Sequence, residues 1–398
     1  MRLILLSLSL LLFALPTTAR ADGPGWEKAY NTGTAHYKAR RLKAAQRSFE
    51  EALEQASGFE KDDVRFATTL HNLGLVYKAQ GKLKQALAAF KKALRIGKKK
   101  LGANDAQVAG IMRSLGNTHM ALGDLDAAIP LLERSLEIRK KKLGEKHTGV
   151  ASSMNDLAIA YGHAGRPADA APLYDAAIAI LEPAAGPNHP IVLTLYLNLA
   201  RTYADLKQTE KAVPVLEKAL KAREATSGPD HKDTLTVRQD LAAALQLLER
   251  HAEAEGHFAK IVQQVEARDG AKSQALADAL SQWGVSQHLG GKTAEAEATF
   301  RRALALREAG GSPLQLAVAE GNLGALLRDL ERYEEADALF TKGLKVFDEA
   351  KTRKDDADEI NLVEHYVRSL NAQGREEEAK PLIERAKRLR MTAAFHAK

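Results

Sequence analysis

The sequence contains no cysteine, and aromatic residues make up only 5% of its 398 positions. Without cysteine the chain can form no disulfide and cannot carry a lipid on an N-terminal cysteine, so side-chain packing alone must stabilise it. Proline is also rare, at 12 residues, whereas alanine, leucine, glutamate, lysine and arginine dominate. These are good helix formers, and the composition therefore favours helices that pack through small side chains over β-sheets.

Long hydrophobic runs are absent except for one at the start of the chain. Arg2 precedes an apolar stretch from Leu3 to Leu15, and Ala19 and Ala21 are small residues of the kind found before a cleavage site. The stretch is 13 residues long, shorter than the ~20 residues of a membrane-spanning helix. We therefore expect residues 1–21 to be a signal peptide cleaved after Ala21, with an uncleaved membrane anchor as the alternative.

Cleavage of this leader predicts a periplasmic or secreted protein of the bacterial cell envelope, with no transmembrane segment in the mature chain. Residues 22–150 then carry 24 Lys and Arg against 14 Asp and Glu, a net charge of +10. Residues 151–398 carry 32 against 37, a net charge of −5. This asymmetry between a basic front half and a mildly acidic back half can orient a charged partner.

One sequence period recurs along most of the chain. A glycine, a leucine or tryptophan, and an alanine each return after 42 residues. These positions are Gly102, Gly144, Gly186, Gly228 and Gly270; Leu73, Leu115, Leu157, Leu199, Leu241 and Trp283; and Ala86, Ala128, Ala170, Ala212, Ala254 and Ala296. A fixed period of this length, kept over several steps, predicts stacked supersecondary units.

Each repeat has the pattern of two antiparallel helices. In one repeat, apolar residues at helical spacing run over residues 70–77 and again over residues 83–94, with Gly81 at a turn between them. Gly74 is small where the two helices must approach closely, and Phe90 is large enough to fill the gap toward the next repeat. Because one repeat cannot bury its apolar stripes alone, we expect the repeats to stack.

This pattern resembles the tetratricopeptide repeat family over nearly the whole mature chain. The family's order of small and large residues recurs, for example at Leu157, Ala158, Tyr161, Gly165, Ala170, Tyr174 and Ala177. The 42-residue period and the Gly-x-x-His turns that begin at Gly144, Gly186 and Gly228 are similar to the kinesin-light-chain variety of the repeat. The resemblance implies an all-α fold, a right-handed α-solenoid of about nine antiparallel helix pairs.

The period drifts toward the C-terminus. After Trp283 the next equivalent residue is Leu323, only 40 positions further on. We therefore expect a solenoid of about eight repeats over residues 22–350. Residues 351–398 are expected to hold a charged connector, Lys351 to Glu359, and a C-terminal capping repeat, since the end of a solenoid needs a polar outer face.

No catalytic, metal or cofactor motif stands out in the sequence. The stretch Ser286–Thr293 almost matches a phosphate-binding loop, but it lacks the first glycine and falls at the turn between two predicted helices. His251, Glu255 and His257 do not have the spacing of a zinc site. No Ser-His-Asp arrangement is recognisable, and the absence of cysteine excludes a thiol nucleophile. We predict a protein without enzymatic activity and without a cofactor or metal.

Three histidines recur at the repeat period, at His147, His189 and His231. Each follows a turn glycine by three residues. If stacked helices keep their usual separation of about 8–10 Å, neighbouring histidines are too far apart to share one metal ion. We expect them to cap the following helix or to pack on the turn, and a pH-sensing row is the alternative.

The resemblance also implies that the first helix of each repeat lines a concave face that binds peptide segments. We expect a partner-binding groove formed by His71, Asn72, Arg113, Asn117, Asn155, Asp156, Asn198, Arg201, Gln239, Asp240 and Asn322. Their amides can bond to a peptide backbone whatever its side chains. Some members of the family clamp a C-terminal carboxylate with Lys and Asn, but Leu75 occupies one of those positions here. The expected partner is therefore an internal segment or a protein surface.

Two basic runs lie 42 residues apart, at the ends of predicted second helices. They consist of Lys98, Lys99 and Lys100, and of Arg139, Lys140, Lys141 and Lys142. Cations near a helix C-terminus contribute ~0.3–1 kcal/mol each, which accounts for one or two of them but not for seven. We expect a basic ridge that contacts an acidic protein, an anionic lipid or a polyanionic glycan. Nucleic acid is not an expected partner, because no aromatic residues lie among the lysines for base stacking.

Together these features predict a non-catalytic scaffold that binds a protein or peptide partner in its concave groove. Two other hypotheses remain open. The chain can instead be an accessory or regulatory subunit of an envelope enzyme or assembly complex, or a structural protein that associates with itself.

Overall fold

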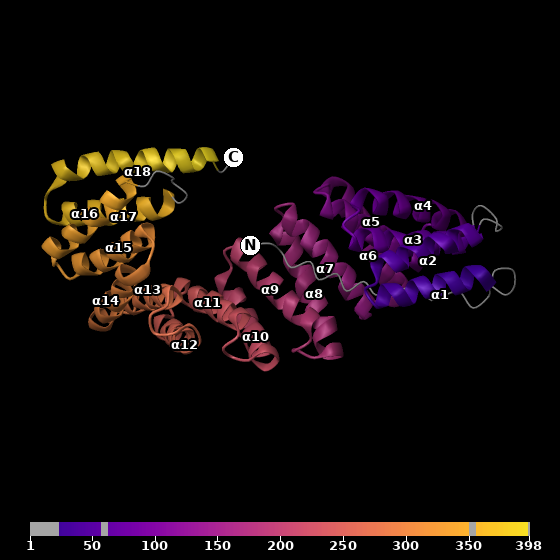
Figure 1. Ribbon diagram of the computed structural model, residues 1–398, viewed down its shortest axis with the longest axis horizontal. Helices are drawn as coiled ribbons and strands as arrows, with labels where there is room; N and C mark the ends of the chain where they lie inside the picture. The colour runs from indigo at the N-terminus through magenta and orange to yellow at the C-terminus, as the bar shows by residue number, and fades with distance from the viewer. Residues whose placement is uncertain (1–23, 57–62, 350–355, 397–398) are drawn as a thin grey trace. The chain divides into compact units, whose positions relative to one another are not determined.

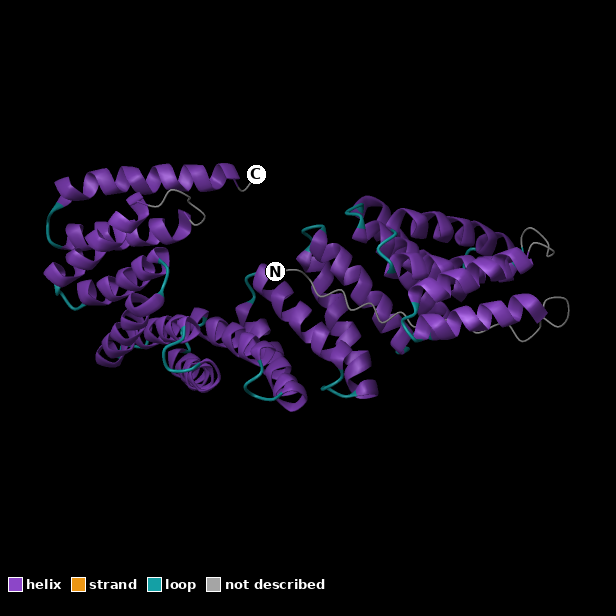
Figure 2. Cartoon of the chain, viewed as in Figure 1, coloured by secondary structure: helices purple, strands orange, loops and turns teal. Residues whose placement is uncertain are grey.

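The computed structural model describes residues 24–56, 63–349 and 356–396, and the regular structure of these residues is helical throughout (Figure 2). The helices are α1 Pro24–Lys38, α2 Leu42–Gln55, α3 Val64–Ala79, α4 Leu83–Leu101, α5 Ala106–Ala121, α6 Leu125–Leu143, α7 Thr148–His163, α8 Pro167–Ala185, α9 Pro190–Asp205, α10 Thr209–Ser227, α11 Lys232–Leu247, α12 His251–Asp269, α13 Gln274–Leu289, α14 Thr293–Gly310, α15 Pro313–Asp329, α16 Tyr333–Glu349, α17 Asp356–Ala372 and α18 Glu376–His396. None of these helices is long and apolar enough to cross a membrane. The predicted signal peptide lies outside the described residues.

Successive helices form antiparallel pairs, as Figure 1 shows for α3 with α4 and for α15 with α16. From α3 to α12 the first helix of every repeat has 16 residues and the second has 19. The second helix of a repeat also packs on the first helix of the next, as α4 does on α5 and α12 on α13. The prediction of an all-α solenoid of about nine helix pairs is confirmed.

The chain divides into two compact units, and the division falls within α10. Unit 1 comprises residues 1–222 and unit 2 comprises residues 223–398. Each unit is built from the same kind of repeat, so the same packing rules apply in both.

Small residues on the first helix allow the second helix to come close. A methyl group built on Gly74 would lie 2.5 Å from Cε1 of Phe90, closer than real side chains approach. The same juxtaposition recurs in four other repeats, at Gly33 with Phe49, Gly116 with Leu132, Gly284 with Phe300 and Gly324 with Phe340. This confirms the prediction that glycine marks the closest approach of the two helices of a repeat.

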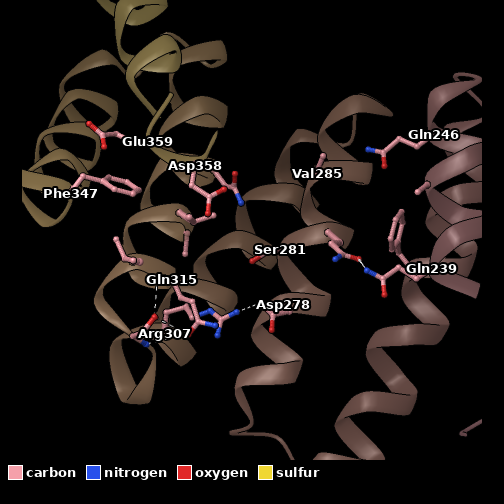
Figure 3. A pocket seen from close by; sticks show the side chains of 18 residues that line it. Gln239, Gln246, Asp278, Ser281, Val285, Arg307, Gln315, Phe347, Asp358 and Glu359 are labelled. Atoms are coloured by element: carbon pink, nitrogen blue, oxygen red, sulfur yellow. Dashed lines mark hydrogen bonds and ion pairs between the residues drawn. The ribbon is translucent and has the colours of Figure 1, made fainter. Parts of the chain in front are cut away.

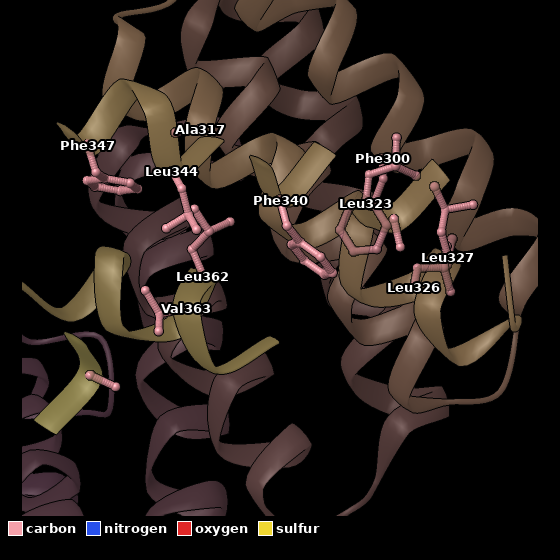
Figure 4. Close-up of a cluster of buried hydrophobic side chains, with 13 residues drawn as sticks. Phe300, Ala317, Leu323, Leu326, Leu327, Phe340, Leu344, Phe347, Leu362 and Val363 are labelled. Atoms are coloured by element: carbon pink, nitrogen blue, oxygen red, sulfur yellow. The ribbon is translucent and has the colours of Figure 1, made fainter. Parts of the chain in front are cut away.

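Large residues of the second helices join one repeat to the next. In unit 2, Figure 4 shows Phe300, Leu323, Phe340 and Leu362, from α14 to α17, in one cluster of buried side chains. Leu362 of α17 is 2% exposed, so the last repeat shares the core of the repeat before it. Packing within and between repeats therefore forms one apolar cluster from α14 to α18.

The charged connector predicted to end at Glu359 is shorter than expected. Residues 356–359 form the first turn of α17. Glu359 is buried, and its Oε1 lies 2.7 Å from Nη2 of Arg385 on α18. A buried carboxylate needs such a partner, and this ion pair fixes the start of α17 on α18. Residues 351–355, the rest of the predicted connector, lie outside the described residues.

The turns between repeats carry their own helix caps. Gly144 ends α6 with a φ of 89°, a conformation that glycine adopts without strain. Three residues later, Nδ1 of His147 accepts a hydrogen bond of 2.9 Å from the backbone N–H of Gly149 at the start of α7. Equivalent side chains cap the first helices of six other repeats, namely Asp63, Asp105, His189, His231, Ser273 and Ser312. The prediction that the three recurring histidines cap the following helix is confirmed.

Candidate functional site

The predicted groove residues of unit 1 lie mostly inside the protein. His71, Asn72, Arg113, Asn117, Asp156 and Asn198 are all buried, Asn155 is half-buried and Arg201 is exposed. The expectation that these side chains are non-core residues of a solvent-facing groove is therefore wrong for six of them. They are buried because the first helices of neighbouring repeats, before or after, pack against them. Contact of any of these residues with a partner stays a prediction.

Hydrogen bonds between these residues connect the first helices of neighbouring repeats. Nδ2 of Asn72 on α3 donates to the hydroxyl of Tyr30 on α1 over 2.6 Å. One repeat further, Nε2 of His71 lies 2.9 Å from Oγ of Ser114 on α5. Such bonds satisfy polar groups that are costly to bury alone, and they fix the register of adjacent repeats.

An ion pair joins the next two first helices, α5 and α7. Nε of Arg113 and Nδ2 of Asn117, both on α5, each donate to Oδ2 of Asp156 on α7 over 2.6 Å. Burial lowers the pKa of the nearby Lys78 amine, and the charge of Arg113 lowers it further while Asp156 opposes both effects. This cluster therefore holds several cations around one carboxylate.

The predicted basic ridge loses one member to the interior. Lys98, Lys99, Lys100, Lys141 and Lys142 are exposed and Lys140 is half-buried. Arg139 is only 4% exposed, and a methyl group built on Gly149 of α7 would lie 2.6 Å from its Nη2. Arg139 therefore faces α7 and not solvent, because it follows Leu132 and Ser135 on the buried side of α6. This corrects its assignment to the ridge.

The lysines at the end of α6 border a small cavity of about 290 Å³. Asn104, which follows the first basic run, lines this cavity together with Lys141 and Lys142. Lys141 is also paired with Glu137, with its Nζ 2.8 Å from Oε1. The cavity thus brings the turn after α4 beside the second basic run. A ligand of the ridge stays a prediction.

Unit 2 holds a larger cavity, of about 870 Å³. The first helices α11, α13, α15 and α17 contribute most of its lining. The lining residues are Gln239, Ala243, Gln246, Phe258, Asp278, Ser281, Gln282, Val285, Arg307, Ser312, Leu314, Gln315, Val318, Ala319, Asn322, Phe347, Asp358 and Glu359. Figure 3 shows Gln239 and Gln246 on one side of this space and Phe347 and Glu359 on the other. We call it the unit 2 cavity.

Five carboxamide side chains line the unit 2 cavity. Gln239 and Gln246 come from α11, Gln282 from α13, and Gln315 and Asn322 from α15. Nε2 of Gln239 donates to Oε1 of Gln282 over 2.9 Å, so adjacent repeats present linked amides. Each amide carries a donor and an acceptor, and together they form a polar strip across three repeats.

Two of these five amides, Gln239 and Asn322, are among the residues predicted from the sequence. Gln282 lies five periods after Asn72 and 40 residues before Asn322. It therefore occupies the equivalent position in its repeat and could have been predicted as a groove residue from the period. Gln315 is near the start of α15, where the period drifts, and nothing in the sequence indicates that it faces the same space. The predicted groove residue Asp240 is exposed and does not line the cavity.

Three of the charged side chains at the unit 2 cavity, Asp278, Arg307 and Glu359, form ion pairs. Arg307 is buried, its Nη1 donates to Oε1 of Gln274 over 2.7 Å, and its Nη2 is bonded to Asp278. Glu359 is paired with Arg385. The lining that is left for a ligand is therefore mainly amide and apolar, the latter from residues such as Val285 and Phe347. In the described ranges no three His, Asp or Glu side chains are placed to hold a metal ion.

Antiparallel helix pairs that recur along the chain, each packed on the next, define a helical repeat protein. Two family models, both of the tetratricopeptide repeat, match the chain. One matches residues 27–99, 107–182, 165–225, 191–267 and 233–309, and the other matches residues 71–142. These matches cover more than half of the sequence, and the chain belongs to the tetratricopeptide repeat family. Repeats of this family generally mediate interactions between proteins, and their scaffold is typically non-catalytic.

Three solved structures similar to this chain share 14–25% sequence identity with it. The kinesin light chain tetratricopeptide-like repeats of Podosopora anserina share 25% identity over 53% of this chain and 99% of that one, with a TM-score of 0.46. BtubC (BKLC) from P. vanneervenii shares 21% identity over 58% of this chain and 95% of that one, with a TM-score of 0.42. The apo form of RapI shares 14% identity over 68% and 99%, with a TM-score of 0.46. No curated protein matches the chain.

Proposed function

We propose that this protein is a non-catalytic scaffold of the bacterial cell envelope, and that it binds a polypeptide segment of a partner protein in the unit 2 cavity. The observation that carries this proposal is the strip of five amides across three consecutive repeats. A peptide backbone offers one donor and one acceptor per residue, and leaving one unpaired on binding costs ~1–3 kcal/mol. Amides on the protein can satisfy both groups whatever the side chains of the segment.

The spacing of the repeats suits an extended segment. Such a segment advances ~3.3 Å per residue, and neighbouring helices are about 8–10 Å apart. About three residues of the partner therefore span one repeat, so each repeat meets a backbone group of the segment at regular intervals. The apolar side chains between the amides, such as Val285, Leu314 and Val318, then provide contact for alternate side chains of the segment.

Export is part of this proposal and rests on residues 1–21. The short apolar run, the small residues before Asp22 and the absence of cysteine all agree with a cleaved leader and a periplasmic or secreted location. The mass of the mature protein purified from its host tests this part directly. A chain that begins at Asp22 in the envelope or medium is expected, and an intact Met1 in the cytoplasmic fraction would contradict it.

Selection of linear peptides on the mature protein tests the groove. We expect peptides selected from a random displayed library to bind the wild type, and their affinity to fall at least tenfold, ~1.4 kcal/mol, in the triple variant Gln239→Ala, Gln282→Ala, Gln315→Ala. Fluorescence anisotropy with the labelled peptides measures the change.

A matched triple variant controls for surface charge and solubility. Lys260, Glu295 and Glu334 are exposed residues of α12, α14 and α16 and do not line the unit 2 cavity. Replacing these three by alanine is expected to leave the affinity within twofold of the wild type. Peptides that bind the amide variant as tightly as the wild type, or a selection that enriches none, would sink the proposal.

A further inference from the structure

Helix α4 carries a concentration of positive charge that no other helix of the described chain has. Its 19 residues include seven lysines and arginines and no aspartate or glutamate. All seven are exposed, namely Lys84, Lys91, Lys92, Arg95, Lys98, Lys99 and Lys100. The equivalent helices α6 and α10 have five and four cations, and each also has three acidic residues. Charge of one sign along a whole second helix is therefore particular to this repeat.

The spacing places most of these cations on one side of α4. Four of them follow one another at intervals of seven, four and three residues and so lie along one line, namely Lys84, Lys91, Arg95 and Lys98. At ~1.5 Å per residue this line is about 21 Å long. The small cavity brings Asn104, in the turn after α4, beside Lys141 and Lys142, so the lysines that end α6 adjoin the C-terminal end of α4. We call the seven cations of α4, together with Lys140, Lys141 and Lys142, the α4–α6 basic surface.

The protein itself neutralises little of this charge. Five of the cations form no ion pair with any residue that the structure describes, and these are Lys84, Lys91, Lys92, Arg95 and Lys98. Lys141 is paired with Glu137. Unbalanced charge of one sign destabilises a folded chain by self-repulsion and attracts ions or partners of the opposite sign.

The other repeats show that packing does not require a lysine at position 98. The equivalent position holds glutamate in four later repeats, at Glu182, Glu224, Glu266 and Glu308. Oε2 of Glu182 lies 3.1 Å from Nζ of Lys218 on the next second helix, and Glu266 pairs with Arg302 in the same way. The two positions that form this ion pair hold Lys98 and Arg134 here. Two cations thus replace a pair that joins neighbouring repeats elsewhere.

We propose that the α4–α6 basic surface binds a membrane surface that contains anionic lipids. A lysine or arginine close to such a surface contributes ~1 kcal/mol, which is about fivefold in affinity. Lipids diffuse within the bilayer, so they can gather under a row of cations that has no preformed pocket. The surface lies in unit 1 and shares no residue with the unit 2 cavity, and the two proposals can therefore fail separately.

The composition of this surface favours lipid over the other anionic partners. Protein interfaces are depleted in lysine and centre on anchors such as buried aromatic side chains. Helix α4 exposes no large apolar side chain, and its one aromatic residue, Phe90, is fully buried. A single nucleic acid strand is held in a basic groove with exposed aromatic residues on which its bases stack. An exposed line of lysines suits a broad surface of negative charge instead.

Flotation of the full mature chain with lipid vesicles tests the proposal. We expect the protein to float with vesicles made of phosphatidylglycerol and phosphatidylcholine in equal parts, and not with phosphatidylcholine alone. Added salt should weaken the association, because salt screens exposed charges. Absence of flotation with the anionic vesicles at low salt would overturn the proposal. Binding to heparin or polyglutamate without binding to the vesicles would also overturn it, and would assign the surface to a soluble polyanion.

Three substitutions on the line of cations test the residues. The triple variant Lys91→Gln, Arg95→Gln, Lys98→Gln is expected to lower the affinity for anionic vesicles roughly a hundredfold, since each cation contributes about fivefold. Circular dichroism of the variant is expected to match that of the wild type, because the three side chains are exposed.

A matched triple variant removes the same charge from unit 2. Its three exposed lysines lie on the second helices α12, α16 and α18 and are replaced by glutamine, namely Lys260, Lys345 and Lys380. We expect its affinity for the vesicles to stay within about twofold of the wild type. Equal losses in the two triple variants would mean that binding follows the net charge of the chain, and the α4–α6 basic surface would be refuted.

The variant Lys98→Glu separates binding from a role in the fold. It introduces the residue found at Glu182 and gives Arg134 the carboxylate that Lys218 has in its own repeat. We expect a higher unfolding midpoint without vesicles and an affinity for anionic vesicles at least tenfold lower. A lower midpoint, or vesicle binding equal to that of the wild type, would show that Lys98 serves the fold and would contradict its assignment to this surface.

Discussion

At single positions, the size of one side chain sets how closely the two helices of a repeat approach. Gly74 of α3 faces Phe90 of α4, and a methyl group there would lie 2.5 Å from the ring. We expect Gly74→Ala to lower the free energy of unfolding by ~1–3 kcal/mol, because an overpacked core must shift its backbone or rotamers. Urea denaturation followed by circular dichroism measures this change.

A second glycine provides the control for that substitution. Gly162 lies in α7, and a methyl group built on it would meet nothing within 4 Å. Gly162→Ala is expected to stabilise the helix by ~0.5–1 kcal/mol, because alanine loses less conformational freedom than glycine. Opposite signs for the two variants would support the close-approach argument, whereas equal losses would contradict it.

A buried histidine makes the stability of unit 1 depend on pH. Burial lowers the pKa of His71 to about 3, with a further contribution from the charge of Arg113. Because the unfolded chain has a histidine pKa near 6.5, the unfolded state takes up the proton first as the pH falls. His71 therefore contributes stability that is present above pH ~6.5 and is lost toward pH 3, at about 1.4 kcal/mol per pH unit.

The variant His71→Asn isolates this contribution, since asparagine occupies the equivalent position at Asn155. We expect the unfolding free energy of the wild type to fall more steeply than that of the variant between pH 6.5 and 4.5. Denaturant titrations at several pH values measure both slopes. Parallel slopes would show that His71 is protonated in the folded protein.

At the scale of the helix, the turns between repeats decide where each first helix begins. Nδ1 of His189 accepts a hydrogen bond of 3.3 Å from the N–H of Ile191 in α9. His189→Ala is expected to cost ~1 kcal/mol and to speed amide exchange at the start of α9, because the cap is lost. His189→Asp should retain the stability, since Asp105 performs the same role before α5. Equal losses in both variants would mean that the histidine acts through packing.

The sequence was sufficient to predict the helices and their caps, because both recur at fixed spacing. It was not sufficient to predict which polar residues of the first helices are exposed. Asn72 and Asp156 are on the polar side of their own helices, yet residues about one period away cover and bond to them. The exposure of these side chains is therefore set by contacts between repeats, which the pattern within one repeat does not show. For Arg139 the repeat gives no consistent signal, because the equivalent positions hold the apolar Leu181 and Val265 but also Arg223 and Arg307.

At the scale of the whole molecule, the main packing contacts of each repeat are with its neighbours. A destabilising substitution should therefore raise hydrogen exchange only in nearby repeats. Phe340 is fully buried in the cluster that joins α15, α16 and α17. Phe340→Ala is expected to cost ~3–5 kcal/mol and to raise hydrogen exchange in α15 to α18, while α3 to α7 keep their protection. Exchange followed by mass spectrometry distinguishes this from a uniform rise along the chain, which would indicate a single cooperative unit.

The turns between repeats also make the repeats interchangeable. Gly144 and Gly186 end their helices at φ values of 89° and 85°, and each is followed three residues later by a capping histidine. Removing residues 145–186 would join Gly144 to Pro187 and regenerate the turn Gly-Pro-Asn-His without a new junction. The length of this chain can therefore change by whole repeats at no conformational cost to the turns. A family of binding proteins of graded length is accessible from this one sequence by deletion or duplication in register.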